Sequence, residues 1–276
     1  MSAKLRRLTA LARIVLLDGL RRHALLGLVA LSVAAQAGAF LFFDFIPRDI
    51  GRASADFILS LAWLSGFIFL FFHCVQVIAL DEERKVIYSL LARPLSRGEY
   101  VIGVFAGLAA LLLLLHLLLA GLGFGALTLI RQMVSQVYFS QFSVWAYLLS
   151  WLGLFFLQLL LLSVILLFSG LVRGSFPVLL VSLAYYAICS GLPVVREAVS
   201  QQAARAEEAA SALHRLLVWL TALFPDFARL DFKNSITAPA ALPEVPLLLI
   251  HFGLTGAYIG LALWLACLVY QGRDLQ

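Results

Sequence analysis

Long apolar runs alternate with shorter polar segments along the whole chain. A helix needs roughly 20 predominantly apolar residues to cross a membrane. Six runs have about this length: residues 23–43, 57–80, 101–130, 144–171, 175–195 and 245–270. The pattern therefore predicts an all-α integral membrane protein, with six transmembrane helices in a single transmembrane domain over residues 1–276.

Residues 1–22 predict a further helix, which lies on the membrane surface. On a helical wheel the basic side chains fall on one half and most of the apolar side chains on the other. The basic set is Lys4, Arg6, Arg7, Arg13, Arg21 and Arg22, and the apolar set is Leu5, Leu8, Ala12, Val15, Leu16 and Leu20. This pattern is typical of an interfacial helix, and a solvated leader is the alternative. Because the basic residues are spread out, they do not resemble a cleavable signal peptide.

Composition and charge agree with a membrane protein. The chain is 63% hydrophobic and only 13% charged, whereas soluble domains are about a quarter charged. The net charge of +5 does not indicate nucleic-acid binding, because the basic residues cluster at the ends of the apolar runs. Counted over the short segments, they place both termini and residues 81–100 in the cytoplasm. A multi-pass membrane protein with this orientation is expected.

Residues 196–244 form a long loop on the external side. Its first part is rich in Ala, Glu, Gln and Arg and reaches Pro225 without an internal Gly or Pro. One or two external helices are therefore predicted, the later one resting on the outer membrane face. Residues 231–246 then return to the last span as an extended segment.

The polar segment 81–100 has more structure than a simple connection requires. Val86, Ile87, Leu90 and Leu91 recur at helical spacing, and Pro94 ends the pattern. Ser96 followed by Glu99 has the spacing of a capping box, which begins a new helix. The segment is therefore predicted to be a helix–break–helix elbow with an apolar stripe that docks onto another protein. A solvated loop whose charges only set the topology is the alternative.

The stretch "SLLARPLSRGEYVIGV", residues 89–104, resembles the first cytoplasmic loop of a family of permeases. These are the permease subunits of bacterial ABC exporters of the second class, including the branch associated with multicopper-enzyme maturation and gliding machinery. Leu90, Leu91, Pro94, Ser96, Arg97, Tyr100 and Gly103 match that pattern, whereas Lys85, Val86 and Val104 depart from it. The predicted six spans, the interfacial helix and the large external loop are also similar to the family.

The resemblance implies that the elbow couples the membrane domain to a separate cytoplasmic ABC ATPase. The implied coupling residues are Glu83, Arg84, Lys85, Ile87, Leu90, Leu91, Pro94, Ser96, Arg97, Glu99 and Tyr100. The chain has no G-x-x-x-x-G-K-[ST] phosphate loop. It is therefore expected to be a non-catalytic subunit with no cofactor of its own, while ATP and Mg bind to the partner. A second permease copy or paralogue is also implied.

Polar and small residues inside the spans suggest other roles. His73, His116 and His251 lie at different depths, so packing or lining of a cavity is favoured over ligation of haem or a metal. Gly121 and Gly125 form a small-x-x-x-small pair suited to helix packing or to a dimer contact. Cys74, Cys189 and Cys267 have neither metal-ligand spacing nor the pattern of a disulfide framework.

Three classes of function remain after the sequence is read. The first is the ABC permease, moving a lipid-like cargo or transmitting force to a periplasmic partner. The second is a membrane-anchored scaffold or assembly factor that binds a periplasmic partner through residues 196–233. The third is a haem or quinone redox subunit.

Overall fold

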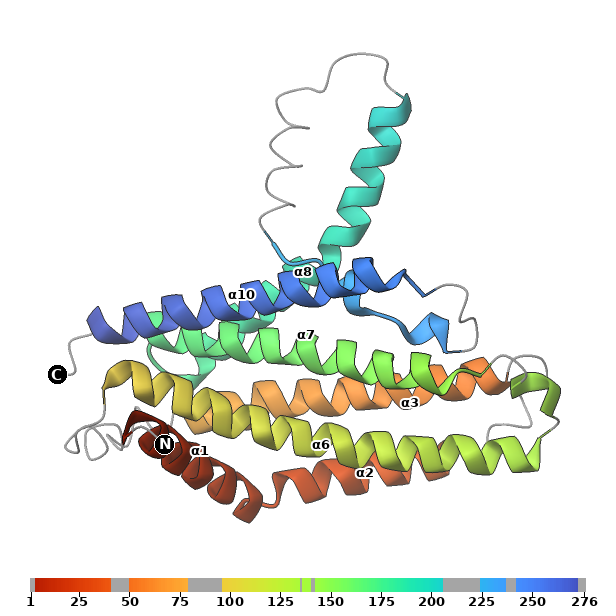
Figure 1. Cartoon of the computed structure of the whole chain (residues 1–276), viewed down its shortest axis with the longest axis horizontal. Helices are drawn as coiled ribbons and strands as arrows, with labels where there is room; N and C mark the ends of the chain where they lie inside the picture. Colours follow the sequence, from red (N-terminus) through yellow and green to blue (C-terminus); the bar gives the residue numbers. More distant parts are fainter. Residues whose placement is uncertain are drawn as a thin grey trace.

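Long helices lie side by side along one axis in the computed structural model of the chain (Figure 1). The structure describes residues 3–40, 50–78, 96–134, 136–139, 142–205, 224–236 and 242–272. None of these described residues is in a β-strand. The predicted all-α class is therefore confirmed.

The described elements follow the order of the predicted runs. They are α1 (Ala3–Arg21), α2 (Ala24–Phe40), α3 (Ile50–Ile68) with the π turn η2 (Phe69–Cys74), α6 (Arg97–Met133), η3 (Gln136–Phe139), α7 (Val144–Leu171), α8 (Ser175–Arg205), η4 (Phe227–Leu230), η5 (Lys233–Ser235) and α10 (Val245–Gly272). Helical residues continue α3 past η2 as far as Ile78.

Five of the described helices are long and apolar enough to cross a membrane. They are Ile50–Ile78, Arg97–Met133, Val144–Leu171, Ser175–Val195 and Val245–Gly272. The first predicted span, 23–43, corresponds to α2, whose 17 residues fall short of that length. Residues 41–49, which follow α2, lie outside the described part of the chain. The structure thus supports a multi-pass membrane protein, while the six-span layout stays a prediction.

One face of α1 packs along the first turns of α6. A methyl group on Gly103 would lie 2.6 Å from a Leu11 methyl, and one on Gly107 would lie 2.6 Å from the Val15 Cβ. The two contacts advance by four residues on each helix, so α1 follows α6 in parallel. Within the chain Leu11 is buried by this contact, whereas Leu5 and Leu20 are exposed, so the placement of the remaining apolar face against the membrane stays a prediction.

A substitution at the α1–α6 contact tests how closely the two helices must approach. Gly107→Ala should lower the free energy of unfolding by about 1–3 kcal/mol, because the new methyl would also lie 2.8 Å from the Ala12 carbonyl oxygen. Gly121→Ala on the same helix is the control. Within the described part of the chain nothing lies within 4 Å of that position, and alanine has the higher helix propensity. Thermal unfolding in detergent measures both variants, and equal destabilisation would contradict the assignment.

Helix α8 contains Pro193 and changes direction near it. A proline inside a helix removes one backbone hydrogen bond and bends the axis. Beyond the bend the helix points away from the bundle (Figure 1). The helix predicted at the start of residues 196–244 is therefore confirmed over residues 196–205, as a continuation of α8, while its external location stays a prediction. The later predicted helix falls at 206–224, and residues 206–223 lie outside the described residues.

Candidate functional site

Ser96 begins α6 with a complete capping box. The Ser96 hydroxyl accepts a hydrogen bond from the Glu99 backbone N–H at 3.2 Å, and the Ser96 N–H donates to the Glu99 carboxylate at 2.9 Å. Two backbone N–H groups that would lack a helical partner are thereby satisfied. The predicted box is confirmed, and it fixes the point at which the polar segment enters the bundle.

Arg97 bonds the start of α6 to the end of α10. Its guanidinium donates to the carbonyl oxygens of Tyr270 and Gln271, at 3.2 and 3.0 Å. The last carbonyls of a helix have no partner within the helix and carry partial negative charge, so a cation is favoured there. A residue of the polar segment therefore caps a helix 173 positions away in the sequence.

Two further contacts extend this junction to α1 and α7. The Glu99 carboxylate lies 3.8 Å from the Arg7 guanidinium on α1. The buried Tyr100 ring packs near the Tyr270 ring, whose hydroxyl is 2.9 Å from the Ser169 hydroxyl on α7. Four helices thus meet where α6 begins, at the end of the bundle at which α1 starts and α10 ends (Figure 1). We call this contact set, from Ser96 to Tyr100 with its partners, the Ser96 junction.

The Ser96 junction contains only part of the predicted coupling set. Ser96, Arg97, Glu99 and Tyr100 are brought together there. The remaining members lie outside the described residues: Glu83, Arg84, Lys85, Ile87, Leu90, Leu91 and Pro94. The sequence did not indicate Arg7, Tyr270 or Gln271. Because two of these three contribute backbone carbonyls, no side-chain pattern could have identified them.

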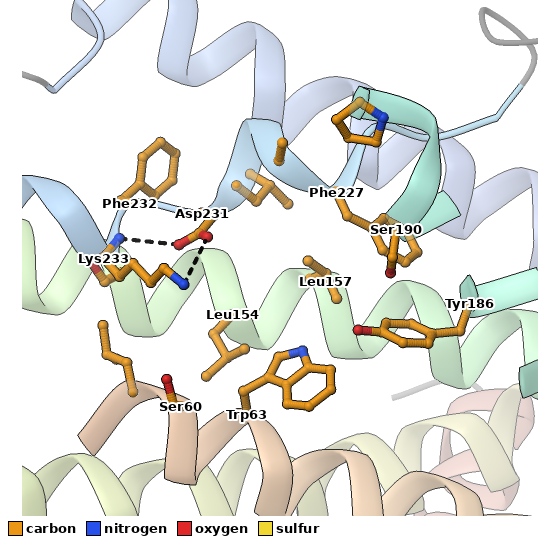
Figure 2. A pocket seen from close by; sticks show the side chains of 15 residues that line it. Ser60, Trp63, Leu154, Leu157, Tyr186, Ser190, Phe227, Asp231, Phe232 and Lys233 are labelled. Atoms are coloured by element: carbon orange, nitrogen blue, oxygen red, sulfur yellow. Dashed lines mark hydrogen bonds and ion pairs between the residues drawn. The ribbon is translucent and has the colours of Figure 1, made fainter. Parts of the chain in front are cut away.

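A cavity of about 440 Å³ lies at another level of the bundle, between α3, α7, α8 and the segment 224–236. Figure 2 shows Trp63, Leu154, Leu157 and Tyr186 around the same space, with the Tyr186 hydroxyl turned into it. No pattern in the sequence indicated this cavity. Its walls come from four separate parts of the chain, and only their packing brings them together.

The segment 224–236 covers the cavity because it packs back onto α7. A methyl group on Gly153 would collide with the Leu230 carbonyl oxygen and would lie 3.1 Å from the Phe232 ring. The Ile236 carbonyl accepts a hydrogen bond from the Ser143 N–H at 3.0 Å. The extended return predicted for residues 231–246 is therefore wrong at Lys233–Ser235, which form the 3₁₀ turn η5; a second 3₁₀ turn, η4, lies just before the predicted segment.

The membrane histidines have surroundings suited to packing. His116 is buried, its Nδ1 lies 2.9 Å from the Leu112 carbonyl oxygen, and the rings of Trp151 and Phe155 pack against it edge to face. His73 stacks on Phe69 within the π turn. In the part of the chain that the structure describes, no three His, Cys, Asp or Glu side chains are grouped to hold a metal ion.

The predicted packing pair Gly121 and Gly125 makes no close contact within the described chain. Nothing lies within 4 Å of a methyl group built at either position. A role for this pair in a contact between two copies stays a prediction. On α6, Gly103 and Gly107, which have the same spacing, do receive another helix, and Gly123 between the predicted pair contacts Ile58 of α3.

Comparison with known proteins gives no match: no protein-family model fits the chain, and no curated protein is similar to it in sequence.

Proposed function

We propose that this chain is the permease subunit of an ABC transporter of the bacterial inner membrane. In this proposal it has six spans, both termini are cytoplasmic, and it works with a second permease copy or paralogue. A separate cytoplasmic ATPase binds ATP and Mg. ATP hydrolysis then drives export of a substrate or mechanical work on a periplasmic partner.

The observation that carries the proposal is the Ser96 junction. The polar segment enters the bundle through a capped helix start that is also bonded to α1 and α10. A solvated loop that only sets topology has no need of such a connection. A force applied to the segment would reach α6, α1 and α10 together, as the rigid-body switching of packed helices requires.

Purification from native membranes tests the proposal. The tagged full-length chain should co-purify with a protein that carries a phosphate loop, and the complex should hydrolyse ATP. Replacing Arg97 with glutamate should keep the complex but lower ATP-driven activity by about tenfold, because the bonds to α10 would be lost. Arg131→Glu, a charge reversal at an exposed position at the opposite end of α6, is the control. A purified chain with no ATPase partner would contradict the proposal.

A scaffold function is the second candidate, and one observation favours it. The helix beyond Pro193 points away from the bundle (Figure 1), as a segment that binds an external partner would do. Truncating residues 196–205 should remove that partner while the ATPase is retained. Loss of the ATPase on this truncation would argue against separate roles for the two regions.

A further inference from the structure

The cavity of about 440 Å³ lies toward the end of the bundle opposite the Ser96 junction. Its α3 wall is Leu59, Ser60 and Trp63, within the first half of the helical run Ile50–Ile78, and its α7 wall, from Ser150 to Leu157, lies within the first half of α7. Both helices start at the end of the bundle opposite the start of α1 (Figure 1). The cavity therefore faces the leaflet farther from the termini.

Aromatic and charged residues place the cavity at the level of the lipid head groups. The exposed Trp145 lies in the first turn of α7, a little more than one turn before the cavity-lining Ser150. Trp and Tyr are enriched at both membrane–water interfaces. The covering segment carries Asp231 and Lys233, whose side chains are 48% and 41% exposed. Charges half-exposed on a membrane protein belong near the interface rather than in the hydrocarbon core.

The inner wall of the cavity is apolar but carries unused hydroxyl groups. Leu59, Leu154 and Leu157 supply aliphatic surface. Rings of Trp63, Phe67 and Phe227 hold the Tyr186 ring, with centroids 5.3–6.0 Å away. Among the described residues, the hydroxyls of Ser60, Tyr186 and Ser190 have no hydrogen-bond partner. Apolar walls with a few directed polar groups are typical of a small-molecule site.

The rim offers one positive and one negative group. The Lys233 ammonium lies 3.6 Å from the Asp231 carboxylate, and the Lys233 backbone N–H donates to the same carboxylate at 3.3 Å (Figure 2). A purely anionic ligand would meet Asp231, and an uncharged ligand would use neither charge. A head group with both a phosphate and an ammonium can use both. The aromatic rings nearby also attract an ammonium group.

We propose that this cavity binds a zwitterionic phospholipid with a phosphoethanolamine head group. The phosphate lies near Lys233 and the free hydroxyls, the ammonium lies near Asp231, and the upper part of one acyl chain lies against Leu154, Leu157 and Trp63. A volume of about 440 Å³ is within the usual range for ligand sites, about 300–1,000 Å³. The rest of the lipid stays in the bilayer. This site requires neither ATP nor an ATPase, so it is independent of the proposed function.

Native mass spectrometry of the purified full-length protein tests the site. Phosphatidylethanolamine, phosphatidylglycerol and diacylglycerol with identical chains are compared as separate probes. The wild-type protein should retain phosphatidylethanolamine about fivefold more than either of the others, a difference of about 1 kcal/mol. Equal retention of the three lipids, or a preference for phosphatidylglycerol, would overturn the proposal.

Two substitutions locate the binding within the protein. Ser190→Trp should fill the cavity from α8 and bring retention of phosphatidylethanolamine down to that of diacylglycerol. Ala184→Trp is the matched control, because Ala184 is an exposed small residue of α8 that does not line the cavity. Asp231→Asn should shift the preference toward phosphatidylglycerol, because the rim would then carry only the positive charge of Lys233. Unchanged retention in a Ser190→Trp protein that elutes and unfolds like the wild type would reject the site.

Discussion

Replacing residues 86–93 with a Gly-Ser linker of equal length is expected to abolish the complex with the ATPase. The replacement removes the predicted apolar stripe of Val86, Ile87, Leu90 and Leu91. Loss of a few such anchors costs about 2 kcal/mol or more at protein interfaces, so affinity should fall about thirtyfold or more. Co-purification and ATP hydrolysis of the purified complex measure the loss.

The replacement must leave the Ser96 junction intact. Ser96 and Glu99 form the helix cap, and Arg97 bonds to α10, so a deletion that included them would also weaken the bundle. The linker therefore ends before Pro94. Ser143→Ala, which removes the equivalent N-cap of α7 outside the coupling set, is the control: it should cost about 1 kcal/mol of stability but leave the stripe and the complex intact. If the linker variant retained both the ATPase and its activity, the coupling role of the segment would be rejected.

Gly153→Val is expected to detach the segment 224–236 from α7 and to open the cavity. The valine side chain would collide with the Leu230 carbonyl oxygen, a backbone atom that cannot rotate away, and with the Phe232 ring. Overpacking of this kind costs about 1–3 kcal/mol. Thermal unfolding should show this loss. Limited trypsin digestion should show faster cleavage after Arg229 and Lys233, which lie in the detached segment.

Gly260→Val on α10 is the matched control for this experiment. Within the described residues nothing lies within 4 Å of a methyl group at Gly260, so the valine can be accommodated at the helix surface. Its digestion pattern and unfolding temperature should stay close to those of the wild type. Unaltered cleavage in the Gly153 variant would mean that this glycine does not hold the segment in place.

The presence of most helices could be predicted from the sequence because the apolar runs are long. The residues at which some of these helices begin depend on local contacts instead. The predicted fourth run matches α7 at both ends. Helix α6, which contains the third predicted run, begins at Arg97, before that run starts at residue 101, because the Ser96 cap sets its first turn. Helix α3 begins at Ile50 and includes Arg52, both of which precede the predicted second run, 57–80. Hydropathy marks the part inside the membrane, whereas the helix itself can extend beyond it.

Contacts between distant segments were not predictable in the same way. Four glycines of α6 have small-x-x-x-small spacing, in two pairs, yet only Gly103 and Gly107 receive another helix. The spacing is the same in both pairs, so the choice depends on where α1 arrives. The cavity was missed for a similar reason: the segment 224–236 is anchored through the backbone oxygens of Leu230 and Ile236, which leave no signature in the side-chain sequence.

The packing of α1 on α6 also constrains the order in which the chain assembles. The surface that receives Leu11, Val15 and Gly19 is built from Gly103, Gly107 and Leu111. During synthesis α1 therefore emerges before α6, and the contact between them can form only after α6 has been made and inserted. Until then its basic residues would be attracted to the anionic surface of the membrane. On the predicted topology, the same helix would be a surface anchor early in biogenesis and a packed element of the bundle in the finished protein.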